Sequence, residues 1–295
     1  MGIPKGGIAF FDSGIGGLTV LHECKKALPF ETFYYYGDNK RAPYGNLPTK
    51  KIKKYVAQAF KRFQRLQVKA VVLACNTVTA VCVEELRVKY SFPIIGAEPA
   101  VLLGAKRGGE TFVLTTRATH ESKRFHVLLE KASTLYPKTK ISAFPCEGLA
   151  GEIEKNILKK EKDYTLFLPR GKPDAVVLGC THYVYIAEQI QRFYGCQIFD
   201  GNCGIALRLC QVLEEKKTQK TQLDPFRPPN AKKASFLPLS KHKKAGREQG
   251  KAKNGKGSKK GEWSKRTILD SGQGRIYFLG SGKRRCKRIN KQTFA

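Results

Sequence analysis

An internal repeat, built around a strand that ends in cysteine, constrains the fold more than any other feature. Residues 70–77 read Ala-Val-Val-Leu-Ala-Cys-Asn-Thr, and residues 175–182, which lie 105 positions further on, read Ala-Val-Val-Leu-Gly-Cys-Thr-His. A weaker pair, 11–13 and 115–117, repeats at an offset of 104. This period is too long for a solenoid of short repeats. Two pairs at nearly one offset therefore predict two related lobes.

The pattern around the repeat is that of an α/β protein. Apolar runs such as 8–11, 70–75 and 175–180 are typical of strands buried in parallel sheets, and segments with helical spacing separate them. We therefore predict two pseudo-symmetric lobes, each an open parallel sheet. In such sheets, sites form beyond the carboxyl ends of the strands. The active site is expected in the cleft between the lobes.

Charge divides the chain a second time. Of the formal net charge of +31, the segment 227–295 carries +18, from 21 Lys and Arg against three acids. Its part 228–268 has almost no aliphatic residues and cannot bury enough apolar surface to offset the entropy of ordering. We therefore expect a first lobe over 1–97, a second over 98–203, a basic disordered segment over 228–268, and a strand within 275–282.

Composition also limits the partners. No apolar run approaches the roughly 18 residues that a membrane span needs, and the start of the chain lacks the pattern of a secretory signal. We expect a cytoplasmic protein whose nine cysteines are reduced. The basic segment is interpreted as a solvated tail. A nucleic-acid contact stays open as the alternative, although aromatic residues for base stacking are nearly absent.

The repeat places Cys75 and Cys180 at the carboxyl ends of two equivalent strands, each just before an expected helix start, which would favour the thiolate. Pseudo-two-fold symmetry would bring the two sulfurs to opposite sides of one cleft. That geometry suits racemisation at an α-carbon, in which a thiolate removes the proton from one face and a thiol returns a proton to the other. Asp12, His182 and an acid on the expected helix 148–159 are candidate helpers.

Other interpretations of these residues remain. A single cysteine is by default a small buried hydrophobe, and we assign this role to the other seven: Cys24, Cys82, Cys146, Cys196, Cys203, Cys210 and Cys286. Zinc bound by Cys75, Cys180 and His182 is disfavoured because no CxxC or HxxxH pair is present. We therefore predict no metal.

Six segments together resemble the glutamate racemases of the aspartate/glutamate racemase superfamily: FFDSGIGGLTVL (10–21), YYGDNKRAPYG (35–45), ACNTVTA (74–80), IIGAEPA (94–100), TTRAT (115–119) and GCTHY (179–183). The resemblance covers about residues 7–215, and it implies that chain over about 204–227 and 270–295 returns to complete the first lobe. It implies a cofactor-independent enzyme that interconverts L- and D-glutamate by two-base proton transfer and supplies D-glutamate for peptidoglycan. Aspartate or another acidic amino acid stays open as the substrate, and so does a homodimer.

The resemblance also implies roles for individual residues. Cys75 and Cys180 take the catalytic thiol positions, assisted by Asp12, His182 and Glu154, with Glu152 as the alternative acid. The substrate-binding positions fall on Asp12, Ser13, Tyr44, Gly45, Asn76, Thr77, Thr116, Thr119, Thr181 and His182. Hydroxyl, amide and backbone N–H groups suit the carboxylates of glutamate, and Asp12 suits its ammonium. Taken singly, Ser13, Thr77, Thr116 and Thr181 are equally well explained as helix caps.

Overall fold

The computed structural model describes residues 3–158, 162–222, 274–281 and 283–294. The basic segment predicted at 228–268 lies outside these ranges. The chain divides into two compact units, residues 1–215 with 266–295, and residues 216–265. Both sheets belong to the first unit, and the described part of the second is the end of one helix.

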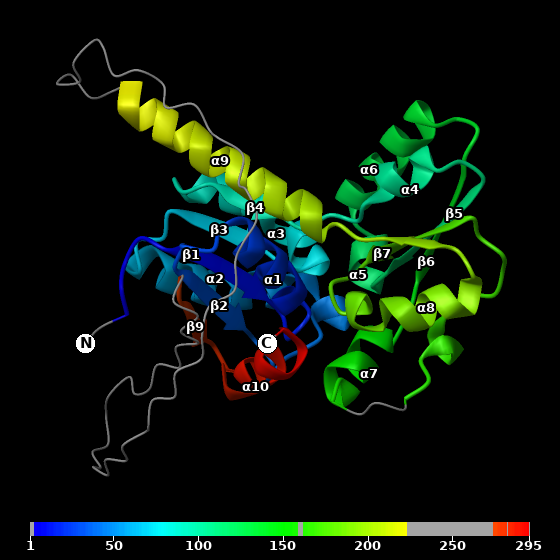
Figure 1. Ribbon diagram of the computed structural model, residues 1–295, viewed down its shortest axis with the longest axis horizontal. Helices are drawn as coiled ribbons and strands as arrows, with labels where there is room; N and C mark the ends of the chain where they lie inside the picture. The colour runs from blue at the N-terminus through cyan, green and yellow to red at the C-terminus, as the bar shows by residue number, and fades with distance from the viewer. Residues whose placement is uncertain (1–2, 159–161, 223–273, 282, 295) are drawn as a thin grey trace, which may run out of the picture. The chain divides into compact units, whose positions relative to one another are not determined.

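The first sheet has five parallel strands in the order β4-β3-β1-β2-β9 (Figure 1). They are β1 (Ile8–Asp12), β2 (Phe33–Gly37), β3 (Ala70–Leu73), β4 (Ile94–Gly96) and β9 (Ile276–Leu279). The strand expected within 275–282 is thus present, and it pairs with β2 at the edge of the sheet.

The second sheet has four parallel strands in the order β6-β5-β7-β8. They are β5 (Glu110–Thr115), β6 (Lys140–Pro145), β7 (Ala175–Gly179) and β8 (Gln197–Phe199). Read from the other edge, β8-β7-β5-β6 repeats the order β4-β3-β1-β2 of the first sheet. The repeated segments form β3 and β7, each beside the central strand of its sheet, so the predicted two-lobe α/β fold is confirmed.

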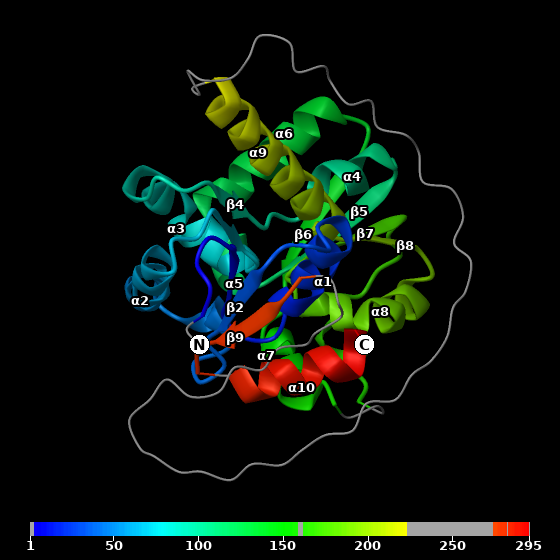
Figure 2. The same ribbon diagram turned by 60° about the vertical axis from the view of Figure 1, so that its left-hand side comes forward.

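Helices cover the sheets (Figure 2). Those of the first lobe are α1 (Gly17–Ala27), α2 (Thr49–Arg65), α3 (Asn76–Lys89), α9 (Asn202–Gln222) and α10 (Lys283–Phe294), with the 3-10 turn η1 (Tyr44–Asn46). Those of the second are α4 (Val101–Lys106), α5 (Arg117–His120), α6 (Lys123–Leu135), α7 (Leu149–Asn156) and α8 (Ala187–Tyr194), with the 3-10 turns η2 (Thr165–Phe167) and η3 (Tyr183–Ile186). No helix in the described ranges combines the length and apolar character of a bilayer span.

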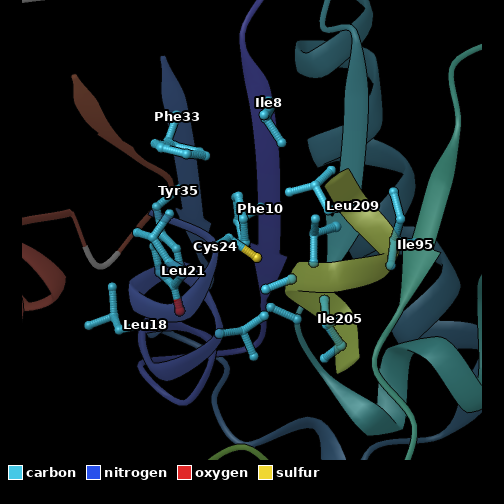
Figure 3. Packing of buried hydrophobic residues seen from close by; sticks show 14 of the residues in the cluster. Ile8, Phe10, Leu18, Leu21, Cys24, Phe33, Tyr35, Ile95, Ile205 and Leu209 are labelled. Atoms are coloured by element: carbon cyan, nitrogen blue, oxygen red, sulfur yellow. The ribbon is translucent and has the colours of Figure 1, made fainter. Parts of the chain in front are cut away.

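Strand alternation explains why both faces of the first sheet are covered. Ile8 and Phe10 point to one face and pack with α1 and α9, as Figure 3 shows, whereas Ala9 and Phe11 point to the other face and pack with α2 and α3. All four side chains are fully buried. Each large apolar side chain buried in this way contributes roughly 1.5–3 kcal/mol. These two layers fix the strand ends that carry the site.

Three of the seven cysteines that we expected to be buried are at least partly exposed. Cys24, Cys82, Cys146 and Cys286 are buried, but Cys196 and Cys210 are partly exposed and Cys203 is exposed. Cys203 lies in the first turn of α9, where Asn202, Ile205 and Ala206 are buried but Cys203 and Gly204 are exposed. Composition alone does not distinguish the two sides of that turn. All nine sulfurs are free thiols.

Candidate active site

The two repeated cysteines lie at the carboxyl edges of their sheets and are almost fully buried. Cys75 follows β3 and is 6% exposed, and Cys180 follows β7 and is 7% exposed. Cys75 directly precedes α3, as predicted. The helix start expected after Cys180 is wrong, because the short η3 comes first and α8 begins only at Ala187. The described group that can bring positive charge to the Cys180 sulfur is therefore a side chain and not an α-helix N-terminus.

His182 is that side chain, and it is held by Glu154. The Cys180 sulfur lies 3.8 Å from Nδ1 of His182, and Nε2 of His182 donates to Oε2 of Glu154 at 2.7 Å. Glu154 also accepts the backbone N–H of Ile15, which belongs to the first lobe, at 3.0 Å. The alternative acid, Glu152, faces Lys155 and Lys162 instead. Of the two candidate acids, only Glu154 contacts the histidine.

Electrostatics favour a charged pair at this position. Burial alone would lower the pKa of His182, but its contacts with Cys180 and Glu154 outweigh burial and raise that pKa well above its usual value. Burial would raise the pKa of Glu154, but His182 and the N–H donors around the carboxylate lower it. Both shifts therefore favour a charged imidazolium–carboxylate pair.

Cys75 has a different environment. Its thiol lies 3.8 Å from Oγ of Ser13. Burial, followed by the charge of Asp12, raises the pKa of the Cys75 thiol far above its usual value, so the sulfur holds its proton. Burial also raises the pKa of Asp12 to about 6, although His182 and the Gly14 N–H lower it in part. One thiol is thus kept protonated while the other faces a cation.

Asp12 lies between the two sulfur environments. Its Oδ1 accepts the N–H of Gly14 at 2.6 Å, and its Oδ2 accepts the hydroxyl of Thr181, from the second lobe, at 3.4 Å. A side chain on Gly16 would meet Oγ1 of Thr181 at 2.5 Å and Nδ1 of His182 at 2.7 Å. A glycine is needed there because the loop after β1 passes directly against the second lobe.

The remaining candidates form a second polar group. Thr77 and Thr116 share a hydrogen bond of 2.9 Å across the lobes, and Thr116 donates to Thr119 at 3.1 Å. A Cβ on Gly45 would lie 2.9 Å from Cβ of Thr116. The Tyr44 hydroxyl donates to Asp38 at 2.6 Å rather than into the site. All these side chains are buried.

The cavity beside Cys180 is small. Asn76, Cys180 and Thr181 line a cavity of only about 10 Å³, which is space for a single water molecule. Thr77 bonds Thr116, and Thr181 bonds Asp12, directly across the two lobes.

Four contacts of the site were not anticipated from the sequence. Asn39 donates to Oε1 of Glu154 at 2.7 Å, and Cys286 lies 3.2 Å from Oδ1 of Asn39. The Tyr35 and Tyr185 hydroxyls donate to the carbonyls of Gly14 and Ile15, both at 2.9 Å. Asn39 could have been found, because it follows the carboxyl end of β2. Nothing in the sequence pairs it with Cys286.

A metal-binding arrangement was the main chemical alternative. Within the part of the chain that the structure describes, no group of three or more His, Cys, Asp or Glu side chains is arranged to hold a metal ion.

Two thiols at equivalent strand ends, in two similar sheets, fit the class of α/β racemases. The family model described as Asp/Glu/Hydantoin racemase matches residues 45–207, more than half of the chain. The protein belongs to this family.

Within this family, the chain is similar to several glutamate racemases. The chain is 38% identical over 233 residues to a glutamate racemase of Clostridium novyi, and the match covers 75% of this chain and 89% of that protein. It is similar to the Escherichia coli glutamate racemase in complex with L-glutamate and the activator UDP-MurNAc-ala (TM-score 0.63, 30% identity, 72% and 83% coverage). It is also similar to the Francisella tularensis glutamate racemase in complex with D-glutamate (TM-score 0.60, 29% identity, 73% and 83% coverage).

Proposed function

We propose that this protein is a glutamate racemase that interconverts L- and D-glutamate by proton transfer at Cys75 and Cys180, without a cofactor. The observation that carries the proposal is the pair of buried thiols at the carboxyl ends of β3 and β7, equivalent strands of two sheets. The glutamate racemases similar in sequence and structure support glutamate as the substrate. The catalytic and substrate-binding roles that the resemblance implies for individual residues belong to the same proposal.

In one direction the Cys180 thiolate, beside the His182 imidazolium, takes the α-proton of the bound amino acid. The electron pair stays on the α-carbon, and the Cys75 thiol gives its proton to the opposite face. Cys180 ends protonated and Cys75 ends as thiolate. The opposite enantiomer reverses both transfers, and exchange with solvent also resets the enzyme. Asp12, whose pKa is about 6, lies near enough to Cys75 to influence the proton on that sulfur.

Substrate binding is proposed for the polar groups that close the empty site. The hydroxyls of Ser13, Thr77, Thr116 and Thr181, with the Asn76 amide, are suited to donate hydrogen bonds to the two carboxylates of glutamate once the lobes separate. Thr119, Tyr44 and Gly45 form the wall behind them. The Asp12 carboxylate is suited to receive the ammonium group of the amino acid. Separation of Thr77 from Thr116 frees donors that are paired in the empty protein.

The test is exchange in deuterated water. The purified protein, without added cofactor, should convert L-glutamate to D-glutamate and place deuterium at the α-carbon. Cys75→Ser and Cys180→Ser should each abolish conversion, because each thiol serves one face. Cys82→Ala, which removes a buried thiol of α3 outside the site, serves as the control. Absence of D-glutamate and of α-deuterium with the unaltered protein would refute the proposal.

The same assay with aspartate separates a glutamate racemase from an aspartate racemase. We place the reaction in the cytoplasm, where free thiols persist, as a source of D-glutamate for peptidoglycan. A homodimer is testable by sedimentation. A nucleic-acid partner of residues 228–268 would be revealed by salt-dependent binding that is lost on their deletion.

A further inference from the structure

We propose that Asn39 is a positioning residue, which holds Glu154 against His182, and that Ser281 and Cys286 of the returning chain hold Asn39 in place. The inference rests on the proposed two-cysteine reaction. It assigns to β9 and α10, more than 230 residues from Asn39 in sequence, a part in only one of the two proton transfers.

Three hydrogen bonds hold the Glu154 carboxylate. Its Oε2 accepts from Ile15 N at 3.0 Å and from His182 at 2.7 Å, and its Oε1 accepts from the Asn39 amide at 2.7 Å. A carboxylate bonded through both oxygens is fixed in rotation as well as in position. Ile15 and Asn39 lie in the first lobe and Glu154 in the second, so the grip forms only where the lobes meet. Glu154 in turn orients the imidazole beside Cys180.

The Cys286 thiol orients the side-chain amide of Asn39. The Cys286 thiol lies 3.2 Å from Oδ1 of Asn39 and donates to it, which leaves the NH₂ group facing Glu154. Cys286 is fully buried, on the face of α10 that packs against the first sheet. Figure 2 shows α10 beside β9, the strand it follows in the chain. A rotated amide would place its oxygen against the carboxylate, and the thiol contact opposes that rotation.

The residues on both sides of Asn39 are held by the same segment. Ser281, in the turn between β9 and α10, donates to Oδ1 of Asp38 at 2.9 Å and accepts the N–H of Lys40 at 3.1 Å. Asp38 also accepts from Tyr44 and Arg41. The loop that presents Asn39 is therefore anchored at three successive residues by chain that enters from the far end of the sequence.

This arrangement predicts an effect on one transition state. From the Asn39 amide, the hydrogen bonds lead through Glu154 and His182 to Cys180. Because the two enantiomers of glutamate have equal free energy, kcat/KM must stay equal in the two directions whatever the variant. A variant that slows only the proton transfer at Cys180 therefore leaves the ratio of the two kcat/KM values unchanged. It changes instead the isotope effects measured with the two α-deuterated enantiomers.

The experiment compares Asn39→Ala with Asn156→Ala, using L- and D-glutamate deuterated at the α-carbon. Asn156 makes a matched amide–carboxylate bond to Glu152 on α7, outside the site. Asn39→Ala should lower kcat/KM about tenfold in both directions. In this variant the deuterium isotope effect on kcat/KM should increase for the enantiomer that gives its α-proton to Cys180. For the other enantiomer it should fall towards one. Asn156→Ala should leave rate and isotope effects as in the unaltered protein.

A second pair of variants covers the case in which Asn39→Ala fails to fold. Cys286→Ser keeps a donor for the Asn39 oxygen and should retain the isotope pattern, whereas Cys286→Ala should shift it in the same direction as Asn39→Ala. An unaltered protein that racemises glutamate, with variants whose isotope effects do not become unequal, would overturn the inference and leave the proposed function standing. A loss of kcat/KM with isotope effects that stay equal for the two enantiomers would also overturn the inference, because it would indicate general damage to the enzyme. No racemisation by the unaltered protein would overturn both.

Discussion

Replacing Asp12 with Asn should stabilise the fold at neutral pH while it abolishes the proposed reaction. The Asp12 side chain is fully buried, and burial raises its pKa from 3.8 to about 6, with His182 and the Gly14 N–H offsetting part of that rise and Glu154 adding to it. The folded protein therefore holds this proton more tightly than the unfolded chain does. The contribution of the group to stability is full below about pH 4, falls as the pH rises towards 6, and stays lost above that.

The size of the effect follows from the difference in pKa. About two units, at 1.36 kcal/mol per unit, correspond to roughly 3 kcal/mol. Asparagine is isosteric with aspartate, keeps an oxygen to accept the Gly14 N–H, and can donate to the Thr181 hydroxyl, so little else should change. We expect the variant to be about 3 kcal/mol more stable than the unaltered protein at pH 7–8 and equally stable near pH 4.

The assay is guanidinium chloride unfolding of both proteins, followed by circular dichroism at half-unit steps from pH 4 to 8. Asp174→Asn, at an exposed position, controls for the loss of one negative charge. A variant less stable than the unaltered protein at pH 8, or a gap of the same size at pH 4 and pH 8, would refute the reasoning. Full racemase activity in the variant would remove Asp12 from the proposed mechanism.

Three further substitutions probe other parts of the molecule. Gly16→Ala places a methyl group within 2.7 Å of Thr181 and His182 atoms, so racemisation should fall at least about tenfold with the fold retained by circular dichroism; normal activity would contradict the closeness of the lobes there. Gly204→Ala, in α9 with nothing within 4 Å of the added carbon, should raise the free energy of unfolding by about 0.5–1 kcal/mol in chemical denaturation, and a loss of stability would be inconsistent with open space. Phe60→Ala, which empties a fully buried ring position, should cost about 3–5 kcal/mol by the same measurement, and a cost below 1 kcal/mol would contradict the described packing.

The two lobes were predictable because their signals are local. A run such as Ala70–Leu73 is apolar at every position, as a strand covered on both faces must be, and its copy at 175 repeats it. Parallel strands carry their carboxyl ends to one edge, so Asp12, Cys75 and Cys180 could be grouped before any distance was known. The structure brings these residues together, and their catalytic roles remain predictions.

Other features depend on packing that no local pattern encodes. The choice of Glu154 over Glu152 depends on which side of α7 faces His182, and two acids two positions apart give no periodic signal that distinguishes them. The contact between Asn39 and Cys286 needs β9 to align beside β2, which a short apolar run at 276–279 does not specify. The exposure of Cys203 depends on which side of the first turn of α9 meets the core.

The position of β9 determines the order in which the molecule can be completed during synthesis. The second sheet draws its strands from the continuous stretch 110–199, so its pairings can all form once that stretch has left the ribosome. The first sheet must wait for residues 276–279, about 240 residues after β2 has been made. Until then β2, with its sequence Phe-Tyr-Tyr-Tyr-Gly, has an open edge of the kind that recruits other strands. The lobe that is encoded first is therefore completed last. A chain that ends before β9 would leave the aromatic strand β2 as an unpaired, aggregation-prone edge.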